Sequence, residues 1–265
     1  MKGVIDFHAH AFPDNLAARA IGILEKGTKI KAHVDGRVSS LLSSMDKSGI
    51  EKTVICSIAT KISQFDSILT FSKKIRSKRI IPFPSIHPDD PEYREHIRQI
   101  KKDGFKGIKI HPYYQQFNLD DEKLFPIYEK ISEENLILVT HSGFDVAYPM
   151  VRRVDPARTL RVKEKFPHLK LVTTHLGGWK DWKAVKKFLV GRKIYMGISF
   201  SLNFLGKEEA REIILNHPRE YILFGTDSPW ADQGESLSLL KKLELGKERE
   251  RLILKENALT LLNSV

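Results

Sequence analysis

The chain has 265 residues, of which 41% are hydrophobic and 29% charged, a balance that is typical of a globular protein and excludes a disordered or fibrous one. Cys56 is the only cysteine, so the sequence excludes an intrachain disulfide and a zinc site built from thiolates. Lys and Arg outnumber Asp and Glu by 44 to 33, a formal net charge of +11, but the basic residues fall on polar faces of predicted helices and form no nucleic-acid-binding motif.

Short apolar runs rich in β-branched residues alternate along the chain with segments of helical period. The runs cover 4–10, 52–59, 80–87, 105–111, 136–141, 169–175, 194–200 and 221–227. The helical segments cover 37–48, 62–76, 91–102, 121–134, 156–166, 180–190, 207–216 and 234–244, and a last helix is predicted at 247–263. This alternation predicts a parallel sheet. Eight strands, each followed by a helix, match an α/β fold of the (β/α)8 TIM-barrel type.

Two further features concern the organisation of the whole chain. No linker rich in Pro, Gly or Ser divides the sequence, so we expect residues 1–265 to form a single TIM-barrel domain. The longest segment without a predicted element is 11–36, directly after the first strand. Long loops inside compact domains are usually functional or mobile, so we expect this one to lie over the functional site.

Histidines gather at one end of the predicted barrel. His8 and His10 are two residues apart in the first strand, so both side chains leave the same face of that strand. The fourth, fifth, sixth and eighth strands end in His111, His141, His175 and Asp227. Because the carboxyl ends of barrel strands line one mouth, where the active sites of barrel enzymes lie, we expect these residues to converge there.

Imidazole nitrogen and carboxylate oxygen are ligands that suit zinc, and catalytic zinc sites keep one position open for water. We therefore predict that His8, His10, His141 and Asp227 hold one divalent ion, Zn²⁺ in the first place, with Mn²⁺ or a second ion as alternatives. A second ion would need a bridging carboxylate, but 105–111 contains no glutamate. Lys109 would bridge only if it were carboxylated. The favoured prediction is that Lys109 binds an anionic group of the substrate.

Four short motifs occur in an order that resembles the amidohydrolase superfamily. They are Asp6-Phe7-His8-Ala9-His10, His175-Leu176-Gly177-Gly178, Phe224-Gly225-Thr226-Asp227-Ser228-Pro229 and Lys255-Glu256-Asn257-Ala258. The chain is most similar to the amidohydrolase-2 branch, which includes the aminocarboxymuconate-semialdehyde decarboxylases. The resemblance implies a distorted barrel with a divalent metal, usually zinc. It also implies that His8, His10, His141 and Asp227 bind this metal and that His175 is an acid–base residue beside it.

The other site residues are given roles from their chemistry. A bound divalent metal lowers the pKa of its water toward about 7, so Asp227 could accept a proton from that water and His175 could protonate a leaving group. Trp179 and Trp230 closely follow the strand-six and strand-eight motifs and are predicted to wall the mouth and contact the substrate, with loop packing as the alternative. His111 is also predicted to contact the substrate, with a metal ligand or a structural cap as alternatives.

The leading prediction is a metal-dependent hydrolase that uses a zinc-activated water on an amide, ester or lactone bond of a small, anionic substrate. The alternative is a zinc-dependent, non-oxidative decarboxylase of a small carboxylic acid, because the branch that the chain resembles uses the same metal and histidines for carbon–carbon cleavage. A nucleic-acid-binding protein with a vestigial barrel is a remote third alternative.

No apolar run approaches the roughly 20 residues of a membrane span, and the first residues lack the apolar core of a signal peptide. We therefore expect a cytoplasmic enzyme with a small-molecule substrate and no membrane or specific nucleic-acid partner, and a homodimer is compatible with the sequence.

Overall fold

Eight parallel strands form the barrel wall in the computed structural model, within its described residues 3–148 and 151–265. They are β1 (Val4–Ala9), β2 (Ile50–Cys56), β3 (Ile80–Phe83), β4 (Gly107–Ile110), β5 (Ile137–Thr140), β6 (Lys170–Thr173), β7 (Tyr195–Gly197) and β8 (Ile222–Leu223). Each strand overlaps one of the predicted runs, and neighbours in sequence are neighbours in space. The predicted (β/α)8 TIM barrel is therefore confirmed.

The barrel is distorted because its strands pair in two arcs. β1, β2 and β3 form one parallel sheet, and β4 to β8 form another. At one seam the backbone N–H of Lys109 donates to the carbonyl of Pro84 at 2.8 Å, and at the other seam the N–H of Phe7 donates to the carbonyl of Phe224 at 2.8 Å. These bonds close the ring and bring the residues that follow β8 beside β1.

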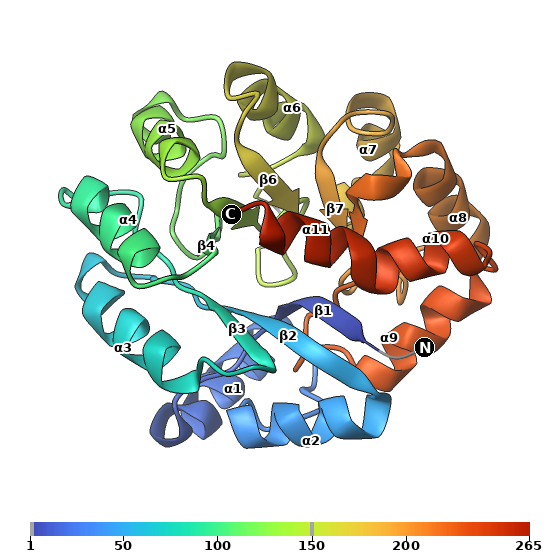
Figure 1. The fold of residues 1–265 in the computed structure, drawn as a ribbon, viewed down its shortest axis with the longest axis horizontal. Helices are drawn as coiled ribbons and strands as arrows, with labels where there is room; N and C mark the ends of the chain where they lie inside the picture. The colour runs from blue at the N-terminus through green and yellow to red at the C-terminus, as the bar shows by residue number, and fades with distance from the viewer. Residues whose placement is uncertain (1–2, 149–150) are drawn as a thin grey trace.

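The helices cover the outside of the barrel (Figure 1). The predicted helical segments contain α2 (Val38–Ser48), α3 (Phe65–Ile75), α4 (Tyr93–Lys102), α5 (Phe125–Glu133), α6 (Pro156–Lys165), α7 (Trp182–Phe188), α8 (Lys207–Asn216), α9 (Gln233–Lys242), α10 (Lys247–Arg251) and α11 (Asn257–Asn263). A π-helical turn at Leu252–Glu256 joins α10 to α11, which agrees with the single helix predicted at 247–263. The helical period of the sequence therefore located these helices correctly.

One helix, α1 (Asp14–Thr28), lies in the segment 11–36 that was predicted to be a loop. The prediction of a loop was wrong. The apolar residues of this helix recur at helical spacing; they are Leu16, Ala17, Ala20, Ile21, Ile23 and Leu24. Alanine is also the best helix former, and the helix includes three of them.

The C-terminal helix closes one end of the barrel. α11 crosses that end in Figure 1, and its residues Leu261 and Leu262 belong to the same buried cluster as Ile5 and Ile137 from the strands. Lys106, which precedes β4, donates to the carbonyl of Leu262 at 2.6 Å. α11 therefore covers the amino ends of the strands, and their carboxyl ends form the open mouth.

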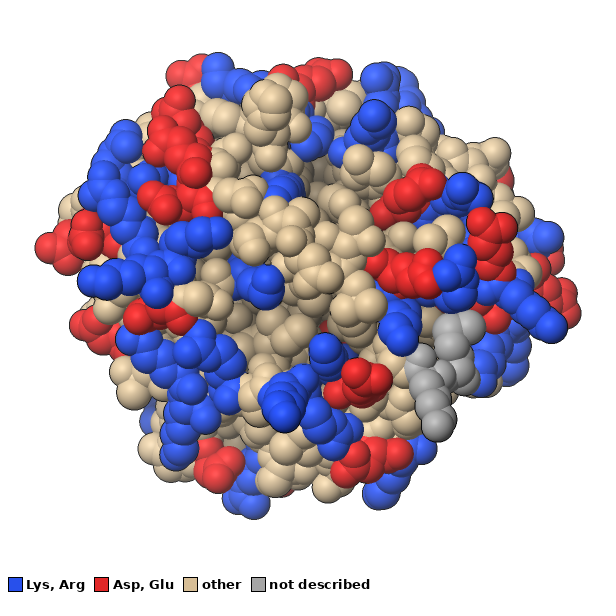
Figure 2. Space-filling model, in the orientation of Figure 1, with Lys and Arg blue, Asp and Glu red and all other residues tan. Residues whose placement is uncertain are grey.

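Positive and negative side chains are mixed on the face shown in Figure 2. Lys and Arg around its rim lie among Asp and Glu rather than in one patch. Exposed ion pairs such as those of Lys186 with Glu209 and Glu212 neutralise part of the basic excess locally. In the part of the chain that the structure describes, no helix combines the length and the apolar character needed to cross a membrane.

We expect acid to destabilise the fold through His217, which links α8 to the residue before β7. Its Nε2 donates to the carbonyl of Ile194 at 2.9 Å, and burial lowers its pKa from 6.5 to about 4. As the pH falls below 6.5, His217 binds a proton in the unfolded chain but not in the folded chain. Stability is therefore lost between pH 6.5 and pH 4. Relative to His217→Gln, the free energy of unfolding of the wild type should fall by about 3 kcal/mol over this range. Urea unfolding of both proteins at pH 7 and pH 4 measures the difference, and parallel pH profiles would contradict the prediction.

Candidate active site at the carboxyl ends of the strands

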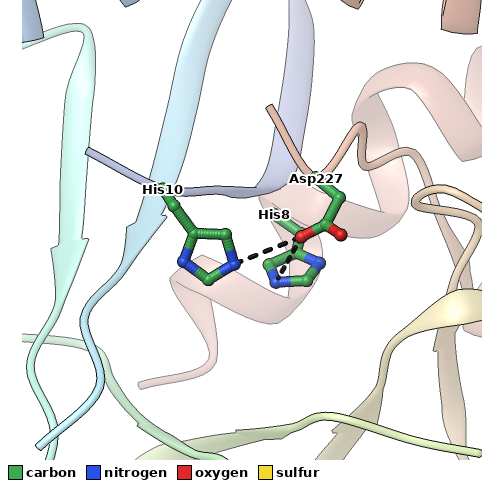
Figure 3. Close-up of side chains that lie close together, drawn as sticks. All are labelled: His8, His10 and Asp227. Carbon is green, nitrogen blue, oxygen red and sulfur yellow. Dashed lines mark ion pairs between the residues drawn. The ribbon is translucent and has the colours of Figure 1, made fainter. Parts of the chain in front are cut away.

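Three of the four predicted metal ligands come together at the mouth of the barrel (Figure 3). His8 lies in β1, His10 follows its last residue, and Asp227 follows β8. The Nε2 atoms of His8 and His10 lie 3.4 Å and 3.2 Å from Oδ1 of Asp227. Ligand atoms of all three lie within 4.8 Å of one another, which is the arrangement that one cation could bridge.

Hydrogen bonds to the outer nitrogens, the Nδ1 atoms, orient these imidazoles. Nδ1 of His10 donates to the carbonyl of Cys56 at 2.8 Å, so the neutral ring carries its lone pair on Nε2, toward Asp227. Nδ1 of His8 lies 2.9 Å from the hydroxyl of Ser199. Burial, followed by the charge of Lys109, lowers the pKa of His8 well below its usual range. Metal ligation requires neutral imidazole and outer partners that orient it, so these residues fit a divalent ion.

The fourth predicted ligand, His141, lies in a second group with His111 and Asp145. The rings of His111 and His141 are stacked with centroids 4.4 Å apart, and Oδ2 of Asp145 lies 3.6 Å and 3.9 Å from their Nε2 atoms. Burial raises the pKa of Asp145 to about 6. Asp145 was not predicted as a site residue, and its one signal in the sequence is its position four residues after a strand-end histidine.

His141 and His175 face each other through atoms that both carry lone pairs. Nε2 of His141 donates to the carbonyl of Phe144 at 3.0 Å, and Nδ1 of His175 donates to the carbonyl of Ser199 at 2.9 Å. The remaining nitrogens, Nδ1 of His141 and Nε2 of His175, are 3.1 Å apart. Burial lowers the pKa of His175 to about 4, so a shared proton is costly at neutral pH. A cation beside this pair would remove the repulsion between the lone pairs, so the pair is suited to lie next to a metal ion.

A buried carboxylate joins the two strands that carry the first three ligands. Asp6 accepts hydrogen bonds from the backbone of His8 at 3.1 Å, from the backbone and hydroxyl of Thr226 at 3.0 Å and 2.7 Å, and from Nε2 of Gln233 at 2.8 Å. Burial raises the pKa of Asp6 to about 6. Asp6 thereby ties β1 to the residue before Asp227, and the sequence analysis gave it no role of its own.

Left-handed backbone occurs at three strand ends around the site. His175 after β6, Phe200 after β7 and Asp227 after β8 have φ values of 56°, 53° and 70°. Such values cost free energy in residues other than glycine and are concentrated at active sites and ligand clamps. This observation marks the same end of the barrel as the histidines do.

Lys109 lies fully buried at the bottom of the site. Its Nζ is 3.3 Å from Nε2 of His8, and burial lowers its pKa. Across residues 3–148 and 151–265, no carboxylate lies within ion-pair distance of this ammonium group. A buried cation without an anionic partner is costly, so its position is suited to a negative group of a ligand.

A cavity of about 590 Å³ opens above these residues. All the predicted site residues line it, including the two tryptophans, Trp179 and Trp230. Most of the remaining lining is apolar, and part of it comes from the segment 11–36, as predicted for that segment. Arg152, which lies in the loop between β5 and α6, is not part of the cavity lining. It forms ion pairs with Asp155 and Asp181.

Replacing Gly143 should damage the site, because this glycine holds the loop after β5 against Trp179. Gly143 has φ +87°, and a Cβ there would lie 2.0 Å from the backbone nitrogen of Trp179. We expect Gly143→Ala to lower the free energy of unfolding by about 3 kcal/mol or more. Gly27→Ala in α1 is the matched control, because a Cβ there meets no atom within 4 Å. Urea unfolding compares the two variants, and equal stability would show that the loop moves aside freely.

The fold and the site together define a class of protein. A (β/α)8 barrel with histidines and an aspartate at the carboxyl ends of β1, β5, β6 and β8 is a metal-dependent barrel enzyme. The chain belongs to the amidohydrolase-2 family, whose model, described as amidohydrolase, matches residues 5–263. The predicted resemblance is therefore confirmed, and the protein is an enzyme of the amidohydrolase superfamily.

Solved structures similar to this chain share its fold. A TIM-barrel protein from Bordetella bronchiseptica has 18% identity and a TM-score of 0.78, over 99% of each chain. A dihydroxybenzoic acid decarboxylase from Polaromonas sp. JS666, with bound manganese and the inhibitor 2-nitroresorcinol, has 15% identity and a TM-score of 0.75, over 99% of this chain and 97% of that one. A 5-carboxyvanillate decarboxylase from Sphingomonas paucimobilis has 13% identity and a TM-score of 0.74, over 99% of each chain. No curated protein matches the chain in sequence.

Proposed function

We propose that the protein is a metal-dependent decarboxylase that releases CO₂ from a small carboxylic acid without oxidation. The observation that carries this proposal is Lys109, a fully buried ammonium group with no carboxylate partner among the described residues, at the bottom of a largely apolar cavity. A substrate carboxylate would pair with it. Two of the similar structures are named as decarboxylases, so decarboxylation takes precedence over the hydrolysis that the sequence analysis put first.

The proposed metal site consists of His8, His10, His141 and Asp227. Its nitrogen and oxygen donors suit zinc, and manganese is the second choice because one similar structure contains it. A divalent ion bound there would hold oxygen atoms of the substrate and withdraw electron density from it. We propose a single ion, since no glutamate lies in β4 to bridge a second one.

The chain's own residues would supply the remaining steps. Lys109 would hold the carboxylate by its charge, and the apolar walls would keep water from the reacting carbon. As the carbon–carbon bond breaks, CO₂ leaves and the electron pair stays on the substrate carbon, which then takes up one proton. Asp227 and His175 line this part of the cavity, and we propose that they relay this proton from solvent water to the carbon, His175 accepting and passing it on through Nε2.

The test is product analysis with the metal-loaded protein and a panel of hydroxylated benzoic acids, esters and lactones. The proposal expects CO₂ and the decarboxylated ring from at least one acid, measured by ¹³C NMR, and no acid release from the esters and lactones. Ester or lactone hydrolysis without CO₂ would overturn it in favour of the hydrolase.

Lys109→Met should lower kcat/KM for the acid by roughly 10²-fold or more, because truncating one partner of a buried charge pair costs about 2–5 kcal/mol. Lys183→Met is the matched control, since Lys183 is an exposed lysine of α7, and it should leave kcat/KM unchanged. Metal content, measured on the same samples, should stay the same in both variants. Unchanged kinetics in Lys109→Met would remove the lysine from the mechanism.

A further inference from the structure

The cavity continues outward from the histidines along α1, and we call this outer part the apolar groove. Leu16, Ala20 and Ile23 of α1 line it. These residues are spaced i, i+4 and i+7, so they share one face of the helix. Ala17 and Ile21, on the adjoining side of the same apolar face, are buried against the protein. α1 therefore has a wide apolar face, of which one side packs and the other faces the groove.

A stripe of α3 lines the same groove. Ser67, Ile68 and Phe71 face the cavity, whereas Phe65 and Leu69 are buried on the other stripe of that helix. α1 and α3, which are separated by α2 and β2 in the chain, thus both present uncharged residues to one space.

The apolar groove has no charge of its own in the described part of the chain. The charged side chains around the whole cavity, apart from the histidines, are Lys109, Asp145 and Asp227, and all three belong to the site described above. At the outer end, Leu16 and Ile23 remain 47% and 60% exposed. Apolar residues left open beside a cavity mark a ligand-binding surface.

We propose that the substrate carries an uncharged apolar extension, such as an alkyl chain or a second ring, that lies in the apolar groove while its carboxylate lies at Lys109. The identity of the reacting group rests on the proposed function. The cavity of about 590 Å³ falls within the roughly 300–1,000 Å³ of sites for drug-sized ligands, so a single carboxylated ring would leave the groove empty. A second copy of the chain is the alternative occupant, and the test below distinguishes it.

Calorimetry of the metal-loaded protein with benzoate and with 4-ethyl-, 4-butyl- and 4-hexylbenzoate tests the proposal. Each added methylene should tighten binding about fourfold, the equivalent of about 0.8 kcal/mol per buried CH₂. The heat capacity change of binding should become more negative along the series, because apolar surface is buried. Both readouts are independent of turnover.

Two variants test whether the apolar extension of the substrate lies in the apolar groove. Ala20→Trp fills the apolar groove and should abolish the gain with chain length, while affinity for benzoate itself stays the same. Ala18→Trp is the matched control, because Ala18 is exposed on α1 and lies outside the cavity lining, and it should behave as the wild type. If Ala20→Trp fails to fold, Ile23→Asp at the exposed end of the groove replaces it. This variant should lower the affinity for 4-hexylbenzoate at least tenfold.

The outcomes separate this inference from the proposed function. Benzoate binding with no dependence on chain length would overturn the apolar extension and leave the decarboxylase proposal standing. Chain-length dependence that is equal in Ala20→Trp and Ala18→Trp would also overturn it. Chain-length dependence without any CO₂ release from the acids would support the groove and overturn the decarboxylase. A sedimentation shift caused by Ala20→Trp would identify the groove as an interface between copies and overturn the proposal.

Discussion

Asp227→Asn is expected to lose both most of its bound metal and most of its turnover. The carboxylate faces the two imidazoles of β1 at 3.2 Å and 3.4 Å, and replacing a ligand costs more than the 10–100-fold in metal affinity that loss of an outer partner costs. Asparagine tolerates the left-handed backbone at this position, where φ is 70°, so the loop itself should be retained. We expect metal affinity to fall more than about 10²-fold and turnover of the loaded variant to fall about 10³-fold. Elemental analysis after dialysis measures the first quantity.

Asp145→Asn provides the matched comparison. Asp145 is also buried and lies among histidines, but in the second group. If the proposed ligands are correct, Asp145→Asn keeps its metal and Asp227→Asn does not. The reverse result would move the metal to the group of His111, His141 and Asp145, and it would contradict the assignment made from the sequence.

His175→Asn should keep its metal and lose turnover by roughly 10²–10⁴-fold, the usual contribution of a general acid–base group. His175 contacts His141 through Nε2 at 3.1 Å and does not belong to either group of convergent ligand atoms. The proposed acid–base role predicts that His175 is not needed to hold the ion. The variant should also change the pH profile of kcat, which a residue with a merely structural role would leave alone.

Single-turnover measurements on samples of known metal content separate these effects for His175→Asn. A stoichiometric loss of metal would make His175 a ligand and would contradict the division of roles. Full activity with full metal content would leave Asp227 as the one proton donor among the two proposed.

The order of the strands, the helices around them except α1, and the gathering of the histidines at one end of the barrel could be predicted from the sequence. Each βα unit repeats the same local pattern, and the barrel converts separate strand ends into one mouth. This is why His8 and Asp227, more than 200 residues apart in sequence, could be placed together before any coordinates.

The features that could not be predicted depend on contacts between distant residues. The bonds of Asp6 to Thr226 and Gln233 bridge opposite ends of the chain, and no local pattern encodes them. Asp145 lies in the loop after β5, where the periodicity of the sequence does not indicate which way a side chain points. The separation of His141 from the first three ligands is likewise a matter of side-chain geometry.

α1 also stands apart from the repeat of the barrel. β1 is followed by α1 and only then by α2, and the two ends of the inserted segment are fastened together, since the N–H of Phe12 donates to the carbonyl of Gly36 at 2.8 Å and Phe12 pairs with Arg37 as an isolated bridge. A segment with its ends joined at the base can change in length and composition while the strands below stay in register. Exchanging residues 13–35 for the corresponding segment of another barrel of this family should therefore replace one wall of the cavity without redesigning the strands.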